Sequence, residues 1–88
     1  MQEKTFVIKN KLGLHARPAA VMVQTAAKFK SRVKIIKDGQ EVDGKSIMGL
    51  MTLAACAGSS VTIAAEGPDE VEALKALSEL VESGFGEE

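Results

Sequence analysis

His15 is the only histidine in the sequence, and it stands just after a Gly-Leu pair and just before a segment of helical composition. A side chain at a helix start meets backbone N–H groups and the positive end of the helix dipole. That field favours the neutral imidazole, whose ring nitrogen can act as a nucleophile, and it stabilises a bound phosphoryl group. Arg17 adds a positive charge and forked donors for phosphate oxygens. The pattern predicts a phosphate-carrying histidine, although position alone also fits a capping or surface histidine.

Ser46 is the second residue of interest, because it follows Gly44-Lys45 and precedes the apolar segment 47–55. A serine in this place is expected to cap the start of a short helix. A phosphate on Ser46 would gain from the same helix-terminus field and from Lys45, so regulation by phosphorylation is a second hypothesis. The helix is very apolar, which indicates either burial or an interaction face. We expect its exposed residues to include Ile47, Met48 and Met51.

Other chemical hypotheses are rejected. Residues 39–46 match the phosphate-loop pattern G-x-x-x-x-G-K-[ST], but Glu41 and Asp43 would place carboxylates inside a cradle for phosphates. Cys56, the only cysteine, lies in an Ala-rich segment where a small buried thiol is the ordinary outcome, so we do not expect it to act as a nucleophile with His15 as its base. One histidine and one cysteine do not predict a metal site, and we expect no cofactor.

Composition indicates a small globular protein. The 88 residues are 45% hydrophobic and 26% charged, which fits one domain over residues 1–88. Neither a signal peptide nor an apolar stretch long enough for a membrane span is visible, so we expect a cytoplasmic monomer that binds no membrane. The three phenylalanines are the only aromatic residues, which argues against stacking on nucleic-acid bases.

Charge is distributed unevenly along the chain. Most lysines and arginines lie in the first half, and the last quarter is rich in aspartate and glutamate. The basic first half suggests a docking face for an acidic partner. The uneven distribution of charge alone is explained more simply by an ordinary solvated surface.

Hydrophobic periodicity predicts the order strand, helix, strand, strand, helix, strand, helix. The expected strands cover 5–9, 32–37, 40–43 and 61–65, and the first two helices cover 16–29 and 47–55. Asp69 and Glu72 predict a capping-box start for the last helix, which is expected to end at Gly84. Its buried face is expected to hold Val71, Leu74, Leu77 and Val81. This order predicts an α+β open-faced sandwich, with one sheet and helices on one face.

Two motifs carry a resemblance to a known family. The segment Gly13–Ala19 resembles the active-site signature of the HPr family, the histidine phosphocarriers of the phosphoenolpyruvate-dependent phosphotransferase system. The segment Lys45–Gly49 is similar to the second signature of that family, around its regulatory serine. Motif spacing, length and element order match along the whole chain. The resemblance implies a four-stranded antiparallel sheet covered on one face by three helices, in the order βαββαβα.

The resemblance also implies a function. His15 would accept a phosphoryl group from phosphorylated enzyme I, whose donor is phosphoenolpyruvate, and pass it to enzyme IIA proteins for sugar transport and its regulation. Ala16, Arg17 and Pro18 would form the phosphate seat. Ser46 would be the target of an HPr kinase/phosphorylase, with a transcriptional regulator as a further partner. The chain would therefore act between enzymes and would not be an enzyme itself. The implied docking residues are Ala20, Gln24, Ile47, Met48 and Met51.

Some features leave alternatives open. Ala54 stands where many family members have glycine, which adds a methyl group close to the active-site face. The segments 10–13 and 83–85 look like the nitrogen-related branch of the family, whereas 46–48 looks like the sugar-transport branch. A regulatory binding module controlled at Ser46, in which His15 carries little phosphate, is the alternative function.

Overall fold

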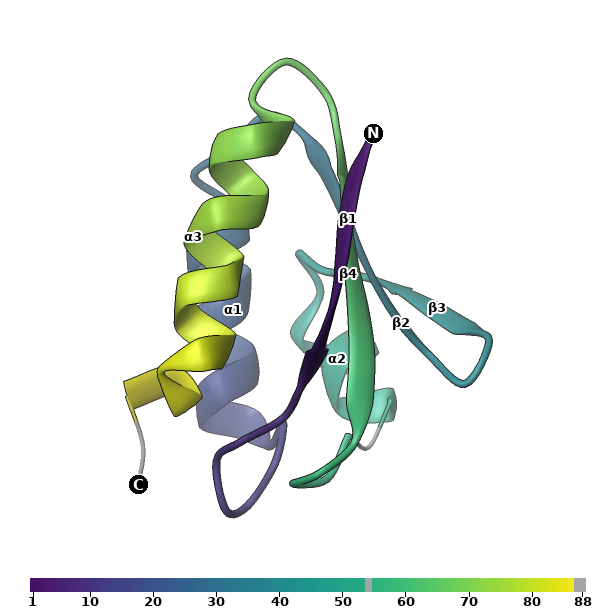
Figure 1. Ribbon diagram of the computed structural model, residues 1–88, viewed down its shortest axis with the longest axis vertical. Coiled ribbons are helices and arrows are strands. Elements are labelled where there is room, and N and C mark those ends of the chain that lie inside the picture. Colours follow the sequence, from purple (N-terminus) through teal and green to yellow (C-terminus); the bar gives the residue numbers. More distant parts are fainter. Residues whose placement is uncertain (54, 87–88) are drawn as a thin grey trace.

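The computed structural model describes residues 1–53 and 55–86, and Figure 1 shows one sheet with the helices on one side of it. The elements are β1 (Gln2–Val7), α1 (Ala16–Ala26), β2 (Arg32–Lys37), β3 (Gln40–Asp43), α2 (Ile47–Thr52), β4 (Ser60–Glu66), α3 (Glu70–Glu82) and a short 3-10 turn (Gly84–Gly86). Their order is the predicted βαββαβα.

The sheet has the strand order β1-β4-β2-β3, and every neighbouring pair is antiparallel. The predicted hairpin joins β2 to β3, with Lys37 paired to Gln40 across Asp38-Gly39. Helix α3 packs against β1 and β4, α2 packs against β3, and α1 packs against both other helices. The predicted α+β open-faced sandwich is therefore confirmed.

The core lies between the sheet and the helix layer. Because side chains alternate along a strand, Ile35 and Ile63 point to the helices, while Thr5 and Thr62 meet on the outer face with hydroxyl oxygens 2.9 Å apart. The core is mainly aliphatic, since the chain has so few aromatic residues. Its largest fully buried apolar side chains are Ile8, Met22, Ile35, Leu50, Ile63, Leu77, Val61 and Val81.

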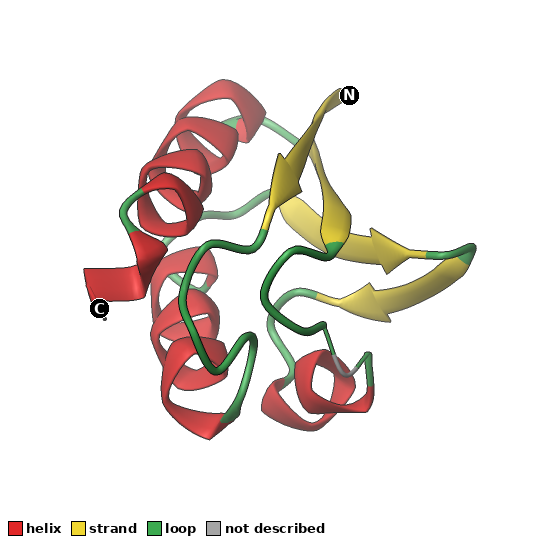
Figure 2. Ribbon diagram, turned by 60° about the horizontal axis from the view of Figure 1, so that its bottom comes forward, coloured by secondary structure: helices red, strands yellow, loops and turns green. Residues whose placement is uncertain are grey.

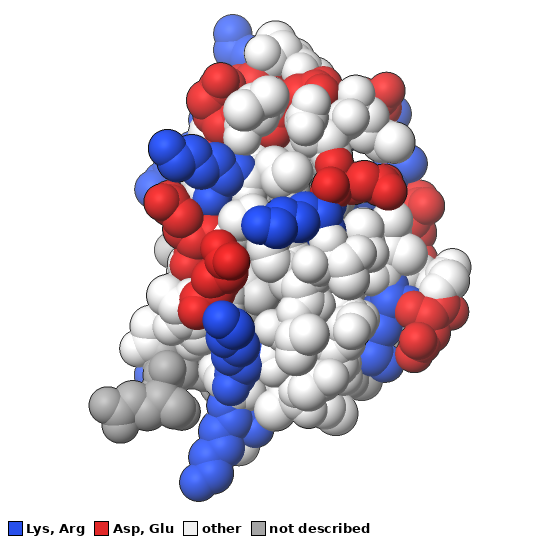
Figure 3. All heavy atoms as spheres, in the orientation of Figure 1, with Lys and Arg blue, Asp and Glu red and all other residues white. Residues whose placement is uncertain are grey.

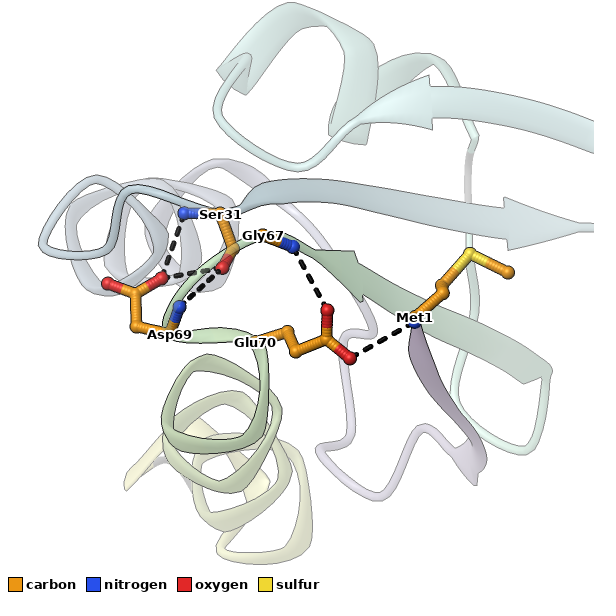
Figure 4. Close-up of polar contacts among 5 residues, drawn as sticks. All are labelled: Met1, Ser31, Gly67, Asp69 and Glu70. Atoms are coloured by element: carbon orange, nitrogen blue, oxygen red, sulfur yellow. Dashed lines mark hydrogen bonds and ion pairs between the residues drawn. The ribbon is translucent and has the colours of Figure 1, made fainter.

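The start of α3 differs from the sequence-based prediction. Asp69 occupies the N-cap position, but its side chain makes no capping bond. Its carboxylate instead accepts a hydrogen bond from the backbone N–H of Lys30 at 2.9 Å. It also accepts hydrogen bonds from Ser31, from the backbone N–H at 2.9 Å and from the hydroxyl (Figure 4). The predicted capping box with Glu72 is therefore wrong, because a partner distant in the sequence engages the capping side chain. Val71 is 58% exposed, so its predicted burial is wrong as well.

The surface carries charges of both signs. Figure 3 shows acidic and basic side chains interspersed over the face that β1 and α3 form, with an uncharged area in its lower middle. The large apolar side chains that are exposed are Met1, Val7, Leu12, Ile47, Met48, Met51 and Val71. Within the described part of the chain, no helix combines the length and the apolar character that a membrane span needs.

Candidate functional site

His15 is the residue immediately before α1. Its backbone is extended, with φ −87° and ψ −169°, and its carbonyl accepts the Ala19 N–H at 3.0 Å, so it is the N-cap of the helix. Its side chain makes no capping hydrogen bond and is half-buried. The structure thus presents the imidazole at the positive end of an 11-residue helix, as the sequence predicts.

The first turn of α1 follows directly. Ala16 and Arg17 are exposed, and Pro18 is buried. A helix does not use its first N–H groups internally, and proline has none to offer, so the outward backbone donors of this turn belong to Ala16 and Arg17. These donors and the helix dipole form a surface suited to an anion, and the exposed Arg17 adds a positive charge to the same turn.

Two loops hold His15 in place. The loop that connects β1 to α1 lies beside the loop that leads into β4, as Figure 2 shows. Leu14 N–H donates to the Ala55 carbonyl at 2.8 Å. Gly13 has φ +72°, and a Cβ added there would stand 2.4 Å from the same carbonyl oxygen. Only glycine fits this position, because the two loops approach each other so closely.

A shallow depression lies beside His15. It is lined by Leu12, Leu14, His15, Ala55 and Cys56 and has a volume of about 220 Å³. Leu12 is 74% exposed, and Cys56 is exposed as well, so the expectation of a buried thiol is wrong. The sequence gives no signal for this grouping, because the two loops are about forty residues apart in the chain and meet only through the fold.

Ser46 is the N-cap of α2, as predicted. Its hydroxyl oxygen accepts a hydrogen bond from the Gly49 N–H at 3.1 Å. The neighbouring Lys45 ammonium donates to the Phe29 carbonyl at 2.9 Å, so it connects the start of α2 to the segment after α1. The Lys45 ammonium therefore has a backbone partner in this structure and helps to hold α2 against the segment after α1.

The outward face of α2 is apolar. Ile47, Met48 and Met51 are 42%, 81% and 47% exposed, which confirms the prediction that they are accessible, whereas Leu50 is fully buried. On the adjacent helix α1, Ala20 is half-buried and Gln24 is exposed. Ala54, whose methyl group was expected near this face, lies outside the described residues.

Within residues 1–53 and 55–86, no group of three or more His, Cys, Asp or Glu side chains could hold a metal ion.

A four-stranded antiparallel sheet, three helices and a single histidine at the start of the first helix define the class of small histidine phosphocarriers. The family described as "PTS HPr component phosphorylation site" matches residues 2–83. The chain therefore belongs to the HPr family, whose members carry phosphoryl groups in the phosphotransferase system and are not enzymes.

Relatives match along the full length. The phosphocarrier protein HPr of Cupriavidus necator is 52% identical over 87 residues, which cover 99% of this chain and 98% of that protein. The crystal structure of an HPr from Thermoanaerobacter tengcongensis superposes with a TM-score of 0.96 at 58% identity, covering 100% of this chain and 99% of the other.

The oligomeric state of a similar protein differs from the expected monomer. An HPr dimer from T. tengcongensis is 57% identical and covers 99% of this chain and 100% of its own, with a TM-score of 0.80. That structure weighs against the expectation of a monomer.

Proposed function

We propose that residues 1–88 form one domain that accepts a phosphoryl group on His15 from phosphorylated enzyme I in the cytoplasm and transfers it to enzyme IIA proteins for sugar transport and its regulation. The single observation that carries this proposal is the placement of His15. Its half-buried side chain stands at the N-cap of α1 without capping the helix, directly before the exposed Arg17.

The transfer step needs few groups from this chain. The lone pair of one imidazole nitrogen forms the new N–P bond while the bond between phosphorus and the donor breaks, and that electron pair stays with the donor. The backbone of Ala16 and Arg17 and the Arg17 guanidinium bind the phosphoryl oxygens, with Pro18 setting the direction of the first helical turn. In the second transfer, the N–P bond breaks while a nucleophilic group of the IIA protein forms a bond to phosphorus. Neither transfer therefore requires a cofactor.

The docking surface for enzyme I and the IIA proteins is formed by adjacent faces of α1 and α2. Helices α1 and α2 pack against each other, and the exposed side chains of α2 are apolar. Such a small apolar surface suits partners that bind briefly and exchange rapidly. The residues that we assign to it are Ala20, Gln24, Ile47, Met48 and Met51.

Ser46 is the proposed regulatory site. It borders the docking surface, because it directly precedes the exposed Ile47 and Met48. A kinase/phosphorylase that modifies Ser46 would place charge at the edge of this apolar face and so control docking, and a transcriptional regulator would read the same state. A module controlled at Ser46 in which His15 carries little phosphate, or membership of the nitrogen-related branch, is the alternative.

One labelling experiment tests the proposal. The protein is incubated with phosphoenolpyruvate, magnesium and a bacterial enzyme I, and its intact mass is measured. We expect a gain of one phosphoryl group that mild acid removes and that His15→Ala abolishes. Labelling of His15→Ala at the unaltered rate would exclude His15 as the acceptor. Failure of the unaltered protein to be labelled by an active enzyme I would shift support to the regulatory module.

A further inference from the structure

Asn10 is a buried polar residue in the loop between β1 and α1. Its side chain is only 2% exposed. The C-terminal turn covers it, since a Cβ added to the buried Gly84 would stand 3.8 Å from the Asn10 Cβ. Burial of an amide in a loop costs free energy unless the amide is hydrogen-bonded. The groups to which it bonds therefore show which part of the structure it stabilises.

The amide nitrogen of Asn10 bonds to the loop that carries His15. The Asn10 side-chain amide Nδ2 donates to the Gly13 carbonyl oxygen at 2.6 Å. In the other direction, the Gly13 N–H donates to the Asn10 carbonyl at 3.0 Å. The two bonds close residues 10–13 into a turn. At Gly13 this turn lies directly against the backbone of Ala55.

The same Gly13 oxygen has a second donor. The backbone N–H of His15 donates to it at 3.0 Å. A carbonyl oxygen has two lone pairs and can accept both bonds. One oxygen atom therefore joins the side chain of Asn10 to the backbone of His15, and the position of His15 depends on how firmly that oxygen is held.

We propose that Asn10 is a positioning residue for phosphoryl transfer, acting on His15 through the Gly13 carbonyl. The bond from Nδ2 holds the carbonyl in the orientation that the His15 N–H requires. The backbone of His15 is then fixed relative to the first turn of α1, where the phosphoryl oxygens bind. Transfer requires the attacking nitrogen within a fraction of an ångström of its productive position, so a looser loop slows the reaction without altering its chemistry.

The test compares Asn10→Ala and Asn10→Ser with the unaltered protein. Neither short side chain reaches the Gly13 carbonyl. With enzyme I in catalytic amounts, we expect kcat for phosphorylation to fall about tenfold, because geometry at the reacting atoms is lost. The KM for this protein should stay within about twofold, because the docking faces of α1 and α2 are untouched. Isolated phosphorylated variants should lose phosphate faster, and the His15 amide should exchange with deuterium faster.

Ser78→Ala is the matched control. The Ser78 hydroxyl is also buried and donates to a backbone carbonyl, that of Leu74 at 2.6 Å, but it lies on α3. Its removal deletes a comparable bond far from His15 in the chain, so we expect it to affect thermal unfolding and to leave kcat and phosphate lifetime unchanged.

Each remaining outcome decides the inference, which rests on the proposed function. If unaltered protein is labelled on His15 and folded Asn10 variants keep the unaltered kcat and phosphate lifetime, the positioning role is wrong while the proposed function stands. If neither Asn10 variant folds, or if Ser78→Ala loses kcat equally, Asn10 serves the fold alone and the inference is also wrong. Absence of labelling in the unaltered protein contradicts the proposed function itself.

Discussion

At the scale of single residues, Cys56 offers a test of how partners reach His15. Both residues line the same shallow depression, and Cys56 is exposed. We expect Cys56→Ser to be phosphorylated by enzyme I within about twofold of the unaltered rate, because the thiol takes no part in the transfer. Alkylation of Cys56 with a bulky maleimide should slow phosphorylation by at least about tenfold, since it fills the approach to the imidazole.

The serine variant is also the control for the reagent. Maleimide treatment of Cys56→Ser should leave its rate unchanged, which shows that inhibition arises from that one thiol. Loss of labelling in the folded Cys56→Ser protein, without any reagent, would contradict this prediction and restore Cys56 as a candidate nucleophile.

Residues differ in how well the sequence reveals them. The position of His15 at a helix start could be predicted because its signal is local: a unique histidine, a preceding Gly-Leu pair and a following helix with Arg17 in its first turn. The burial of Asn10 and the exposure of Cys56 beside His15 could not be predicted in this way. The environment of Asn10 is formed by its side-chain bond to Gly13 and by the C-terminal turn that covers it. Cys56 lies beside His15 because the fold brings two distant loops together.

At the scale of elements, boundaries were predicted best where a local turn defines them. The strands 32–37 and 40–43 agree with β2 and β3, because Asp38-Gly39 is a strong hairpin signal and both residues have positive φ. Helix α1 ends at Ala26 instead of at 29, where an Ala-rich composition alone gives no stop signal. At α3, the local capping pattern failed because Asp69 bonds to Ser31, 38 residues earlier.

The effect of charge at the start of α2 can be tested by substitution of Ser46. Aspartate caps helices as well as serine does, so Ser46→Asp should keep α2 folded. Its charge lies next to Ile47 and Met48, which belong to the proposed docking surface, and desolvating a carboxylate there opposes binding. We expect the KM for phosphorylation by enzyme I to rise about tenfold, measured by initial rates of label transfer.

Ser46→Asn separates charge from shape in that experiment. Asparagine also caps helices and matches aspartate in size, so it should leave KM near the unaltered value. Equal effects of the two substitutions would assign the change to the shape of the side chain, and no effect of Ser46→Asp would contradict control by charge at this position.

At the scale of the whole molecule, the two ends of the sheet serve different purposes. One end holds His15 between two loops, and the opposite end holds a polar network around the start of α3, which Figure 4 shows. In that network the Glu70 carboxylate accepts the Gly67 N–H at 3.1 Å and lies 3.1 Å from the Met1 amino group. The network therefore connects β1, the β4–α3 turn and the segment before β2 at the end of the sheet opposite His15.

We expect this network to make the stability of the protein depend on pH. The Ser31 hydroxyl, together with the Lys30 N–H, lowers the pKa of Asp69 below its usual 3.8, and the Gly67 N–H lowers the pKa of Glu70 below its usual 4.5. Carboxyls with a depressed folded pKa stabilise the protein fully above their unfolded pKa, and this contribution is lost as the pH falls through the folded value. We therefore expect the thermal unfolding midpoint, followed by circular dichroism, to fall as the pH is lowered below about 5. Asp69→Asn should show a lower midpoint at neutral pH and a smaller fall over that range, because the titrating group is gone.

Asp38→Asn, at the exposed hairpin turn, should follow the unaltered profile. An Asp69→Asn profile parallel to that of the unaltered protein would show that Asp69 does not contribute to the pH dependence.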